Sequence, residues 1–183
     1  MAHCTATTSG TPSDLDETFM AIAIGEAKRA MEEDEVPVGA AIACGGELIA
    51  MDHNRVRSMG VATAHGEMLA IAAAARKLGD WRLSNCTLYS TKEPCPMCAG
   101  ACVMSRIGRV VFAVSDQAMG CLGGGPLNFS NVEHFNHRFP VSSGVRAEES
   151  LALLRKFFSA KRRSPMQKKR QPPLSALDIG ANS

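Results

Sequence analysis

The stretch TKEPCPMCAGAC, residues 91–102, constrains the fold more than any other part of the chain, because it places three cysteines and two prolines in twelve residues. Cys95 and Cys98 are three residues apart, a spacing that puts both thiols on one face of a helix. Pro96 fits the first turn of that helix, where its missing N–H costs nothing. Both sulfurs then lie at the positive end of the helix dipole, which favours thiolates. Two neighbouring thiolates repel each other, so the stretch predicts a cation between them.

A third ligand is available in His65, at the start of the predicted helix that precedes this stretch. One imidazole and two thiolates balance the charge of Zn²⁺, and three protein ligands leave a fourth position for water, as in catalytic zinc sites. Glu67 does not share the helix face of His65 and is free to handle protons beside that position. We therefore expect one Zn²⁺ per subunit, held by His65, Cys95 and Cys98, with Glu67 as the catalytic residue.

Two other interpretations of the cysteines stay open. A redox Cys-x-x-Cys pair usually belongs to a thioredoxin-like unit, and it would need neither His65 nor Glu67. A closed structural zinc site could recruit Cys102, four residues beyond Cys98, as a fourth ligand. Cys102 lies one turn deeper in an apolar helix, however, where a small buried thiol is the more common role.

Helical and β-rich segments alternate along the chain. Helices are expected from Ser13 to before Pro37, over 65–78, over 95–105 and over 148–163, and strands over 36–44, 47–54, 86–91, 109–114 and 139–145. Ser13 and Asp16 form a capping-box pattern, and Gly45-Gly46 predicts a two-residue hairpin. Residues 115–131 are expected to form a glycine-rich loop with no element of its own. This order predicts an α/β fold whose sheet is covered on both faces and whose later strands are parallel.

The order His65-x-Glu67 and then Pro94-Cys95-x-x-Cys98 is the signature of zinc nucleobase deaminases, and the zinc and proton-transfer roles given to these residues are recognised from that signature. Around it, the segments EVPVGAAIA, TAHGEM, TLYSTKEPCPMCAGACVMSRIGRVVF, FNHRF and LLRKFFSAKRR resemble the bacterial tRNA-specific adenosine deaminases, over roughly residues 15–163. The resemblance implies a three-layer α/β/α sandwich of the cytidine deaminase type, with a mixed, mostly parallel five-stranded sheet, and a homodimer. It also implies hydrolysis of the wobble adenosine to inosine in the anticodon stem-loop of a tRNA, an arginine tRNA in particular.

The same resemblance assigns roles to individual residues. Glu67 would take a proton from the attacking water, give it to ring N1 and help ammonia to leave. The implied substrate-binding residues are Asn54, Gly66, Asp116, His137 and Arg138. Asn54 would contact the flipped purine, Asp116 the target ribose, and the segment at 137–138 the anticodon loop. Alternatives remain for three of them: Asn54 as an ordinary turn residue, Asp116 as a loop cap, and Arg138 as an internally paired side chain.

Two positions depart from the family pattern. Gly66 stands where the family usually has alanine, which we expect to remove one methyl group from the pocket wall. The loop at 120–128 is richer in glycine, and we expect it to be looser, with broader substrate choice or slower closure. Neither departure removes a catalytic group.

Composition sets the remaining expectations. The 183 residues fit one domain, with polar disordered tails at 1–12 and 164–183 around a zinc-dependent deaminase domain at 13–163. No apolar run approaches the about 20 residues of a membrane span, and no secretory signal is present, so we expect a cytoplasmic protein without a membrane partner. Residues 151–177 carry eight basic residues and no acidic one. Lys161 to Arg163 are thus expected to contact the tRNA backbone, unless the segment is only a solvated helix end.

Two rival functions remain. A deaminase of free bases or nucleotides, of the guanine or cytosine type, would share the EPCPMC segment. A non-catalytic RNA-binding module stabilised by zinc would leave Glu67 without a purpose. The basic C-terminal segment and FNHR favour an RNA substrate.

Overall fold

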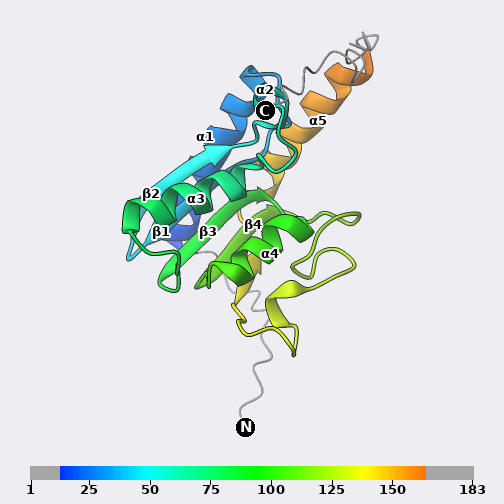
Figure 1. The fold of residues 1–183 in the computed structure, drawn as a ribbon. Helices are drawn as coiled ribbons and strands as arrows, with labels where there is room; N and C mark the ends of the chain where they lie inside the picture. Colours follow the sequence, from blue (N-terminus) through cyan, green and yellow to red (C-terminus); the bar gives the residue numbers. More distant parts are fainter. Residues whose placement is uncertain (1–12, 164–183) are drawn as a thin grey trace, which may run out of the picture.

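A computed structural model describes residues 13–163, and the tails expected at 1–12 and 164–183 lie outside the described residues. A five-stranded sheet forms the centre of the molecule, with helices on both of its faces (Figure 1). The strands are β1 (Gly39–Cys44), β2 (Glu47–His53), β3 (Cys86–Lys92), β4 (Arg109–Val114) and β5 (Val141–Ser143). The helices are α1 (Asp14–Glu32), α2 (Val56–Met59), α3 (Gly66–Leu78), α4 (Pro96–Met104) and α5 (Ala147–Arg163). The short helix α2 was not expected from the sequence.

The strand order is β2-β1-β3-β4-β5, and the sheet is mixed, as predicted. Strand β1 runs antiparallel to both β2 and β3, whereas β3, β4 and β5 are parallel. Because β1 is antiparallel to both of its neighbours, β2 points in the same direction as β3, β4 and β5, and only β1 runs the opposite way, in agreement with the predicted mixed, mostly parallel sheet. The carboxyl ends of β3 and β4 lie at the same edge of the sheet, where parallel α/β folds usually place their sites.

Alternate residues of the central strands face two separate cores. Ala40 and Ile42 of β1 join a cluster with residues of α3 and α4, and Ala41 and Ala43 join a second cluster with residues of α1. Successive side chains of a strand point to opposite faces, so both faces of this sheet must be apolar. The three-layer α/β/α arrangement follows, with α1 and α5 on one face and α3 and α4 on the other (Figure 1).

Helix α1 begins and ends where the sequence indicated. The Ser13 hydroxyl accepts a hydrogen bond of 3.1 Å from the backbone N of Asp16, whose carboxylate accepts from the Ser13 backbone, which completes the capping box. The helix ends at Glu32, before Pro37. It packs tightly on the sheet at Gly39, where an added Cβ would lie 2.1 Å from the carbonyl oxygen of Ala23.

The predicted hairpin between β1 and β2 is also present. Gly45 and Gly46 have φ values of 60° and 86°, and Cys44 pairs directly with Glu47. Two consecutive positive φ values are what a two-residue turn of the primed type requires, and glycine reaches them without steric cost.

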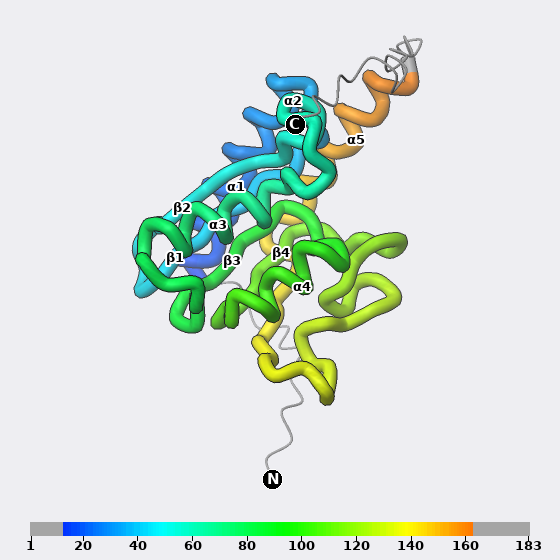
Figure 2. Tube along the Cα trace, viewed as in Figure 1, coloured from blue at the N-terminus to red at the C-terminus, as the bar shows by residue number. Residues whose placement is uncertain are grey.

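A long excursion between β4 and β5 carries the chain past α4 (Figure 2). We expected no helix or strand in residues 115–131. This expectation is wrong, because the structure has one short 3-10 helix there, η1 (Phe129–Asn131). Asn128 caps this turn by accepting a hydrogen bond of 3.1 Å from the backbone N of Ser130. Within residues 13–163, no helix has both the length and the apolar character that crossing a membrane requires.

Candidate active site

Two helix N-termini bring one histidine and two cysteines together at the carboxyl edge of β3. His65 is the N-cap of α3, and Cys95 is the N-cap of α4 with Pro96 as the first helical residue. Neither side chain forms a capping hydrogen bond with its helix, and both point at a common centre. Nδ1 of His65 lies 3.7 Å from Sγ of Cys95 and 3.6 Å from Sγ of Cys98, and the two sulfurs are 3.7 Å apart.

This triangle fits one Zn²⁺. Zn–S bonds of about 2.3 Å and Zn–N bonds of about 2.0–2.1 Å at tetrahedral angles separate such ligand atoms by about 3.6–3.8 Å. The three observed separations fall in this range. His65, Cys95 and Cys98 are therefore a group that could hold a metal ion, and a fourth tetrahedral position is left to a non-protein ligand.

The charges of the three groups suit a divalent cation. The hydrogen bond between the two sulfurs, together with the one to His65, lowers the pKa of Cys95 to about 4 against the effect of burial. The same sulfur contact, followed by burial, raises the pKa of Cys98, and the hydrogen bond to Cys95 raises the pKa of His65. Without a metal, the thiol pair thus carries one negative charge and one proton, and binding of a metal releases that proton.

Cys102 does not join the ligand group. It is fully buried among the apolar side chains between α4 and the sheet, and burial raises the pKa of its thiol. It is absent from the set of ligand atoms that lie close together around His65. The structure therefore does not support the closed four-ligand site that the sequence left open.

Glu67 lies one helical position beyond Gly66, with its carboxyl group buried beside the ligand triangle. The residue is 3% exposed, and burial raises the pKa of its carboxyl group. The Ser90 hydroxyl lies 3.1 Å from Oε1, whereas the buried Oε2 has no hydrogen-bond partner within residues 13–163. An unpartnered buried carboxylate oxygen is costly, unless a substrate, water or ion satisfies it. The arrangement thus leaves one Glu67 oxygen available for chemistry.

A cavity of about 320 Å³ opens over these groups. Its lining residues come from the α1–β1 loop, from the ends of β2 and β3, and from α2, α3 and α5, and they include His65, Glu67, Cys95, Asn54 and Phe158. The volume is that of a small-molecule pocket. The cavity therefore joins the candidate metal centre and Glu67 to the Asn54 side chain in one space.

Asn54 is held in place by a residue that the sequence analysis missed. Glu35, fully buried in the cavity wall, accepts hydrogen bonds from Nδ2 of Asn54 at 3.0 Å and from the backbone N of Ser58 at 2.7 Å. Since a carboxylate only accepts hydrogen bonds, this contact fixes which end of the Asn54 amide faces Glu35. Glu35 is the first residue of the segment EVPVGAAIA, but nothing in the pattern of that segment indicates a partner nineteen residues away.

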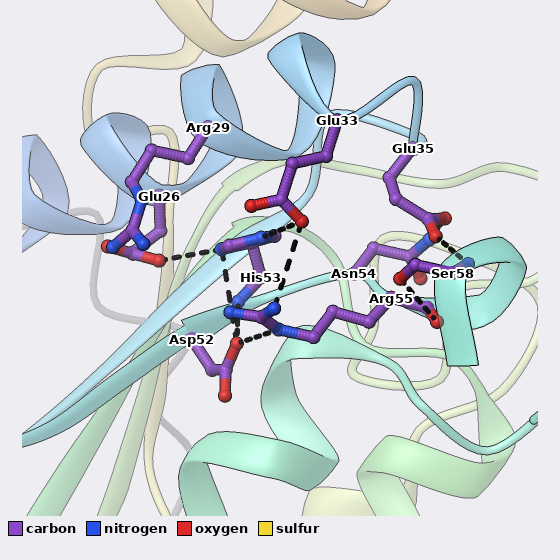
Figure 3. A network of polar contacts seen from close by, with 9 residues as sticks. All are labelled: Glu26, Arg29, Glu33, Glu35, Asp52, His53, Asn54, Arg55 and Ser58. Atoms are coloured by element: carbon purple, nitrogen blue, oxygen red, sulfur yellow. Dashed lines mark hydrogen bonds and ion pairs between the residues drawn. The ribbon is translucent and has the colours of Figure 1, made fainter.

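The residue before Asn54 anchors the end of β2 to α1, as Figure 3 shows. His53 is fully buried, with Nδ1 2.7 Å from Oε2 of Glu26 and Nε2 3.2 Å from Oε2 of Glu33. Arg55 extends the network, since its guanidinium contacts Asp52 at 2.9 Å and Glu33 at 3.7 Å. These polar contacts of His53 and Arg55 thus secure the backbone on both sides of Asn54.

Asp116 lies in the loop after β4, next to the cavity. Its side chain pairs with the ammonium group of Lys92, which lines the cavity. Although burial opposes ionisation, this pairing and two backbone N–H donors, of Ala118 and Met119, hold the pKa of Asp116 below its usual value. The loop-capping alternative is thus part of what Asp116 does, and its carboxylate also contacts Lys92, which lines the cavity.

The glycine-rich loop is more tightly packed than we expected. A Cβ added at Gly120 or Gly124 would lie 2.1 Å or 2.4 Å from Oε2 of Glu93, and one at Gly125 would lie 2.3 Å from the carbonyl oxygen of Gly120. The expectation of a looser loop at 120–128 is therefore wrong for this part of the loop. The glycines are required by close packing around a buried carboxylate.

Gly66 lies at a close approach of α3 to β2. An added Cβ would be 3.0 Å from Cα of His53 and 3.2 Å from the carbonyl oxygen of Asp52. The missing methyl group therefore faces the backbone of β2 and not the cavity, which corrects the expectation about the pocket wall.

His137 and Arg138 are engaged elsewhere in the chain. Nε2 of His137 lies 2.7 Å from the carbonyl oxygen of Ile107, just before β4 begins. Arg138 donates to the carbonyl oxygens of Val132 at 3.3 Å and Glu133 at 2.8 Å. Because β3 and β4 are parallel, this end of the sheet is opposite to the edge that carries the candidate metal centre. The structure does not bring these two residues to the cavity of their own chain.

The basic face of α5 is partly paired within the chain. Lys161 forms an ion pair with Asp34, and Asp34 also accepts from Arg57 at 2.6 Å. Lys161 moreover lies over the ring of Phe157. The positive charge of Lys161 is therefore partly neutralised by the carboxylate of Asp34.

Comparison with known proteins places this site in a family. The cytidine and deoxycytidylate deaminase zinc-binding region matches residues 13–114. The tRNA-specific adenosine deaminase of Bacillus subtilis is 49% identical over 143 residues, which cover 78% of this chain and 88% of that protein. A solved structure from a study of A-to-I editing by tRNA:A34 deaminases has a TM-score of 0.71 at 39% identity, covering 75% of this chain and 99% of that one. A guanine deaminase structure from Nitrosomonas europaea has a TM-score of 0.68 at 27% identity, covering 86% and 100%.

The matched region contains the whole ligand triangle and Glu67, so fold and sequence together define a zinc-binding deaminase domain. The chain belongs to the cytidine and deoxycytidylate deaminase family. Within that family, it is similar over most of its length to the bacterial tRNA-specific adenosine deaminases.

Proposed function

We propose that this protein hydrolyses the 6-amino group of adenosine at the wobble position of a tRNA anticodon, which leaves inosine and ammonia. The observation that carries the proposal is the unpartnered Oε2 of Glu67 beside the His65, Cys95 and Cys98 triangle in one cavity. The choice of tRNA rests on the similarity to tRNA-specific adenosine deaminases.

His65, Cys95 and Cys98 would hold the metal ion, because their donor atoms match the distances and the charge that zinc requires. A bound Zn²⁺ supplies Lewis acidity that makes a water nucleophilic near neutral pH. The chain's own task is to orient the base, exclude solvent and move the protons.

Glu67 carries the protons. As a carboxylate it takes a proton from the attacking water through Oε2 and donates it to ring N1; it then takes the second proton, from the new C6 hydroxyl, and donates that one to the leaving amino group. Ser90 positions the carboxyl group, because its hydroxyl donates to Oε1 of Glu67 at 3.1 Å and also reaches the carbonyl oxygen of Lys92 at 2.7 Å. Oε2 is left as the oxygen that takes up and releases protons.

The cavity walls suit a base that has left its stack. Val36, Val38, Leu154 and Phe158 supply apolar surface, and the Asn54 amide supplies the polar contact to the base edge. Enzymes that act on a nucleobase bind it between apolar walls with a few hydrogen bonds. Asn54 is proposed to bind the purine in the orientation that Glu35 sets.

The RNA is proposed to reach this cavity as the anticodon stem-loop of an arginine tRNA. Asp116, beside the mouth of the cavity, would accept from the 2′-hydroxyl of the target ribose, a contact that distinguishes RNA from DNA. The basic C-terminal segment would contact phosphates in a salt-dependent manner. We also propose that His137 and Arg138 contact the anticodon loop, that the protein is a homodimer, and that it is cytoplasmic.

A deaminase of free guanine is the second candidate, because a guanine deaminase structure covers 86% of this chain at 27% identity. One experiment separates the two. The purified protein is incubated with an arginine tRNA that bears an ACG anticodon, and separately with free guanine, cytosine and adenosine, beside a Glu67→Ala control. We expect inosine at the wobble position only with the unmutated protein and the tRNA. Deamination of free guanine without that of tRNA would overturn the proposal.

A further inference from the structure

Glu93 is a buried carboxylate that neither the metal centre nor the proton transfer uses. It is 2% exposed and lies two residues before Cys95. Four backbone N–H groups of one loop donate to it. Oε2 accepts from Asp116 at 2.9 Å, and Oε1 accepts from Leu122 at 2.9 Å, Gly124 at 2.9 Å and Gly125 at 3.3 Å. The loop at 116–125 is thus wrapped around a single side chain.

The loop can adopt this path only because glycines surround the carboxylate. Side chains at Gly120 and Gly124 would collide with Oε2, at 2.1 Å and 2.4 Å respectively. Such separations are far below any real contact between a carbon and an oxygen, and the carboxylate cannot move away without losing its four donors. Glu93 and these glycines therefore form one packed unit.

The unit is joined directly to the active site. Lys92, one residue before Glu93, pairs with the side chain of Asp116, while Glu93 accepts from the backbone N of the same residue. Pro94, one residue after Glu93, accepts a hydrogen bond of 3.1 Å from the backbone N of Cys121. Three consecutive residues that lead into the metal ligand Cys95 thus hold the loop in place.

We propose that Glu93 is a positioning residue, which sets the loop at 116–125 so that Asp116 stays beside Lys92 of the cavity wall, in reach of the target ribose. The role that it gives to Asp116 rests on the proposed function. A carboxylate is required because all four partners are donors, and a glutamine would turn its own N–H₂ group toward one of them. Glu93 acts through the loop and does not touch the reacting atoms.

The test uses the full-length, zinc-loaded protein and its Glu93→Gln variant. The lost acceptor should raise the KM for an anticodon stem-loop about tenfold, with kcat changed less than about threefold. The variant should retain one zinc per chain, and amide hydrogen exchange should accelerate in residues 116–125 and stay unchanged in α1. A fall in kcat with unchanged KM, or a loss of zinc, would overturn a positioning role.

A double-mutant cycle with Asp116→Ala asks whether Glu93 acts through Asp116. If it does, Glu93→Gln raises the KM little further in the Asp116→Ala background. If the two substitutions instead raised the KM by factors that multiply in the double variant, the proposal would be contradicted. A stem-loop with 2′-deoxyadenosine at the target position gives a second readout, since the unmutated protein should prefer the ribose form and Glu93→Gln should lose most of that preference.

Gly124→Ala disturbs the same unit from the loop side, and it carries the test if Glu93→Gln does not fold. It should raise the KM and accelerate amide hydrogen exchange in the loop, as Glu93→Gln does. Gly25→Ala is the control and should change neither quantity, because the added Cβ on α1 meets no described atom within 4 Å. The exchange readout is independent of the reaction. If the unmutated protein deaminates no tRNA, the proposed function fails, whereas unchanged exchange of the loop in Glu93→Gln overturns the role of Glu93 whatever the activity.

Discussion

The Ser90 hydroxyl lies 3.1 Å from Oε1 of Glu67 and 2.7 Å from the carbonyl oxygen of Lys92. A hydroxyl has one proton, so it cannot donate fully to two acceptors at once. The hydroxyl therefore shares its proton between Oε1 of Glu67 and the carbonyl oxygen of Lys92. Ser90 thus positions the carboxyl group through Oε1, while Oε2 stays available for proton transfer during turnover.

The first prediction concerns this pair. Glu67→Gln keeps the shape of the side chain but cannot accept a proton, so kcat for tRNA deamination should fall about 10²–10⁴-fold. Ser90→Ala should have a smaller effect, of about tenfold, because Oε2 of Glu67 remains available. Both variants should retain one zinc per chain by metal analysis. Glu67→Gln with kcat near that of the unmutated protein would contradict the assignment.

The second prediction compares two cysteines on one helix. Cys98→Ser removes a ligand and should lose stoichiometric zinc together with activity. Cys102→Ser makes the same chemical change four residues further on, among apolar side chains, and should keep both. Zinc content after gel filtration under reducing conditions is the measurement. Loss of zinc in Cys102→Ser would restore the closed four-ligand site as the better account.

The third prediction tests how α1 packs on the sheet. Gly39→Ala would place a methyl group 2.1 Å from the carbonyl oxygen of Ala23, so the helix must move away from β1. Overpacking of this kind should destabilise the protein by about 3 kcal/mol or more. Gly25→Ala in the same helix meets no atom within 4 Å and should be neutral, or stabilising by up to about 1 kcal/mol. The measurement is the urea concentration at which half of each variant is unfolded. Equal unfolding midpoints for Gly39→Ala and Gly25→Ala would refute the close approach of α1 to β1.

The fourth prediction concerns the buried ion pair of Asp16 and Arg109, whose guanidinium donates to Asp16 at 2.8 Å and 3.0 Å. Arg109→Met leaves the buried carboxylate unpaired, and should cost about 2–3 kcal/mol at pH 7, a value reduced because Arg109 is partly exposed. Arg82→Met, at an exposed pair with Asp80, is the control and should cost about 0.5 kcal/mol or less.

The same pair predicts a pH dependence. Burial opposes ionisation of Asp16, but Arg109 and the Tyr89 hydroxyl outweigh it and hold the pKa of Asp16 below its usual value. A lowered pKa in the folded state contributes stability that is present above the unfolded value, about 3.9, and is lost as the pH falls through the folded value. The stability difference between the unmutated protein and Arg109→Met should therefore narrow below about pH 4. If the difference in unfolding free energy between the two proteins stayed constant from pH 7 to pH 3, ionisation of Asp16 would not be linked to stability in this way.

The candidate metal centre could be predicted because its cysteine pair is local and its histidine belongs to a known signature. Cys95 and Cys98 share a helix face by spacing alone, whereas His65, 30 residues before Cys95, was recognised from the deaminase signature. The capping box at Ser13 and the turn at Gly45-Gly46 are equally local, and the structure confirms both. Backbone preference and short-range hydrogen bonds decide such features before any tertiary contact forms.

The support of the site could not be predicted in the same way. Glu35 reaches Asn54 across nineteen residues, and Glu93 reaches the loop at 116–125 across 23 to 32 residues. No periodicity or motif relates such partners. The expectation of a loose glycine-rich loop was wrong for this reason, since glycine count alone does not show what the glycines pack against.

The sequence by itself determined the ligand types, their positions at helix starts and the alternation of helices with strands, because these follow from spacing and local backbone preference. Only the tertiary structure decided that Cys102 is core, that Oε2 of Glu67 is unpartnered, and that His137 and Arg138 lie away from the cavity of their own chain. The physical reason is that burial and pairing depend on which distant segments meet, and those meetings are set by the packing of helices on both faces of the sheet.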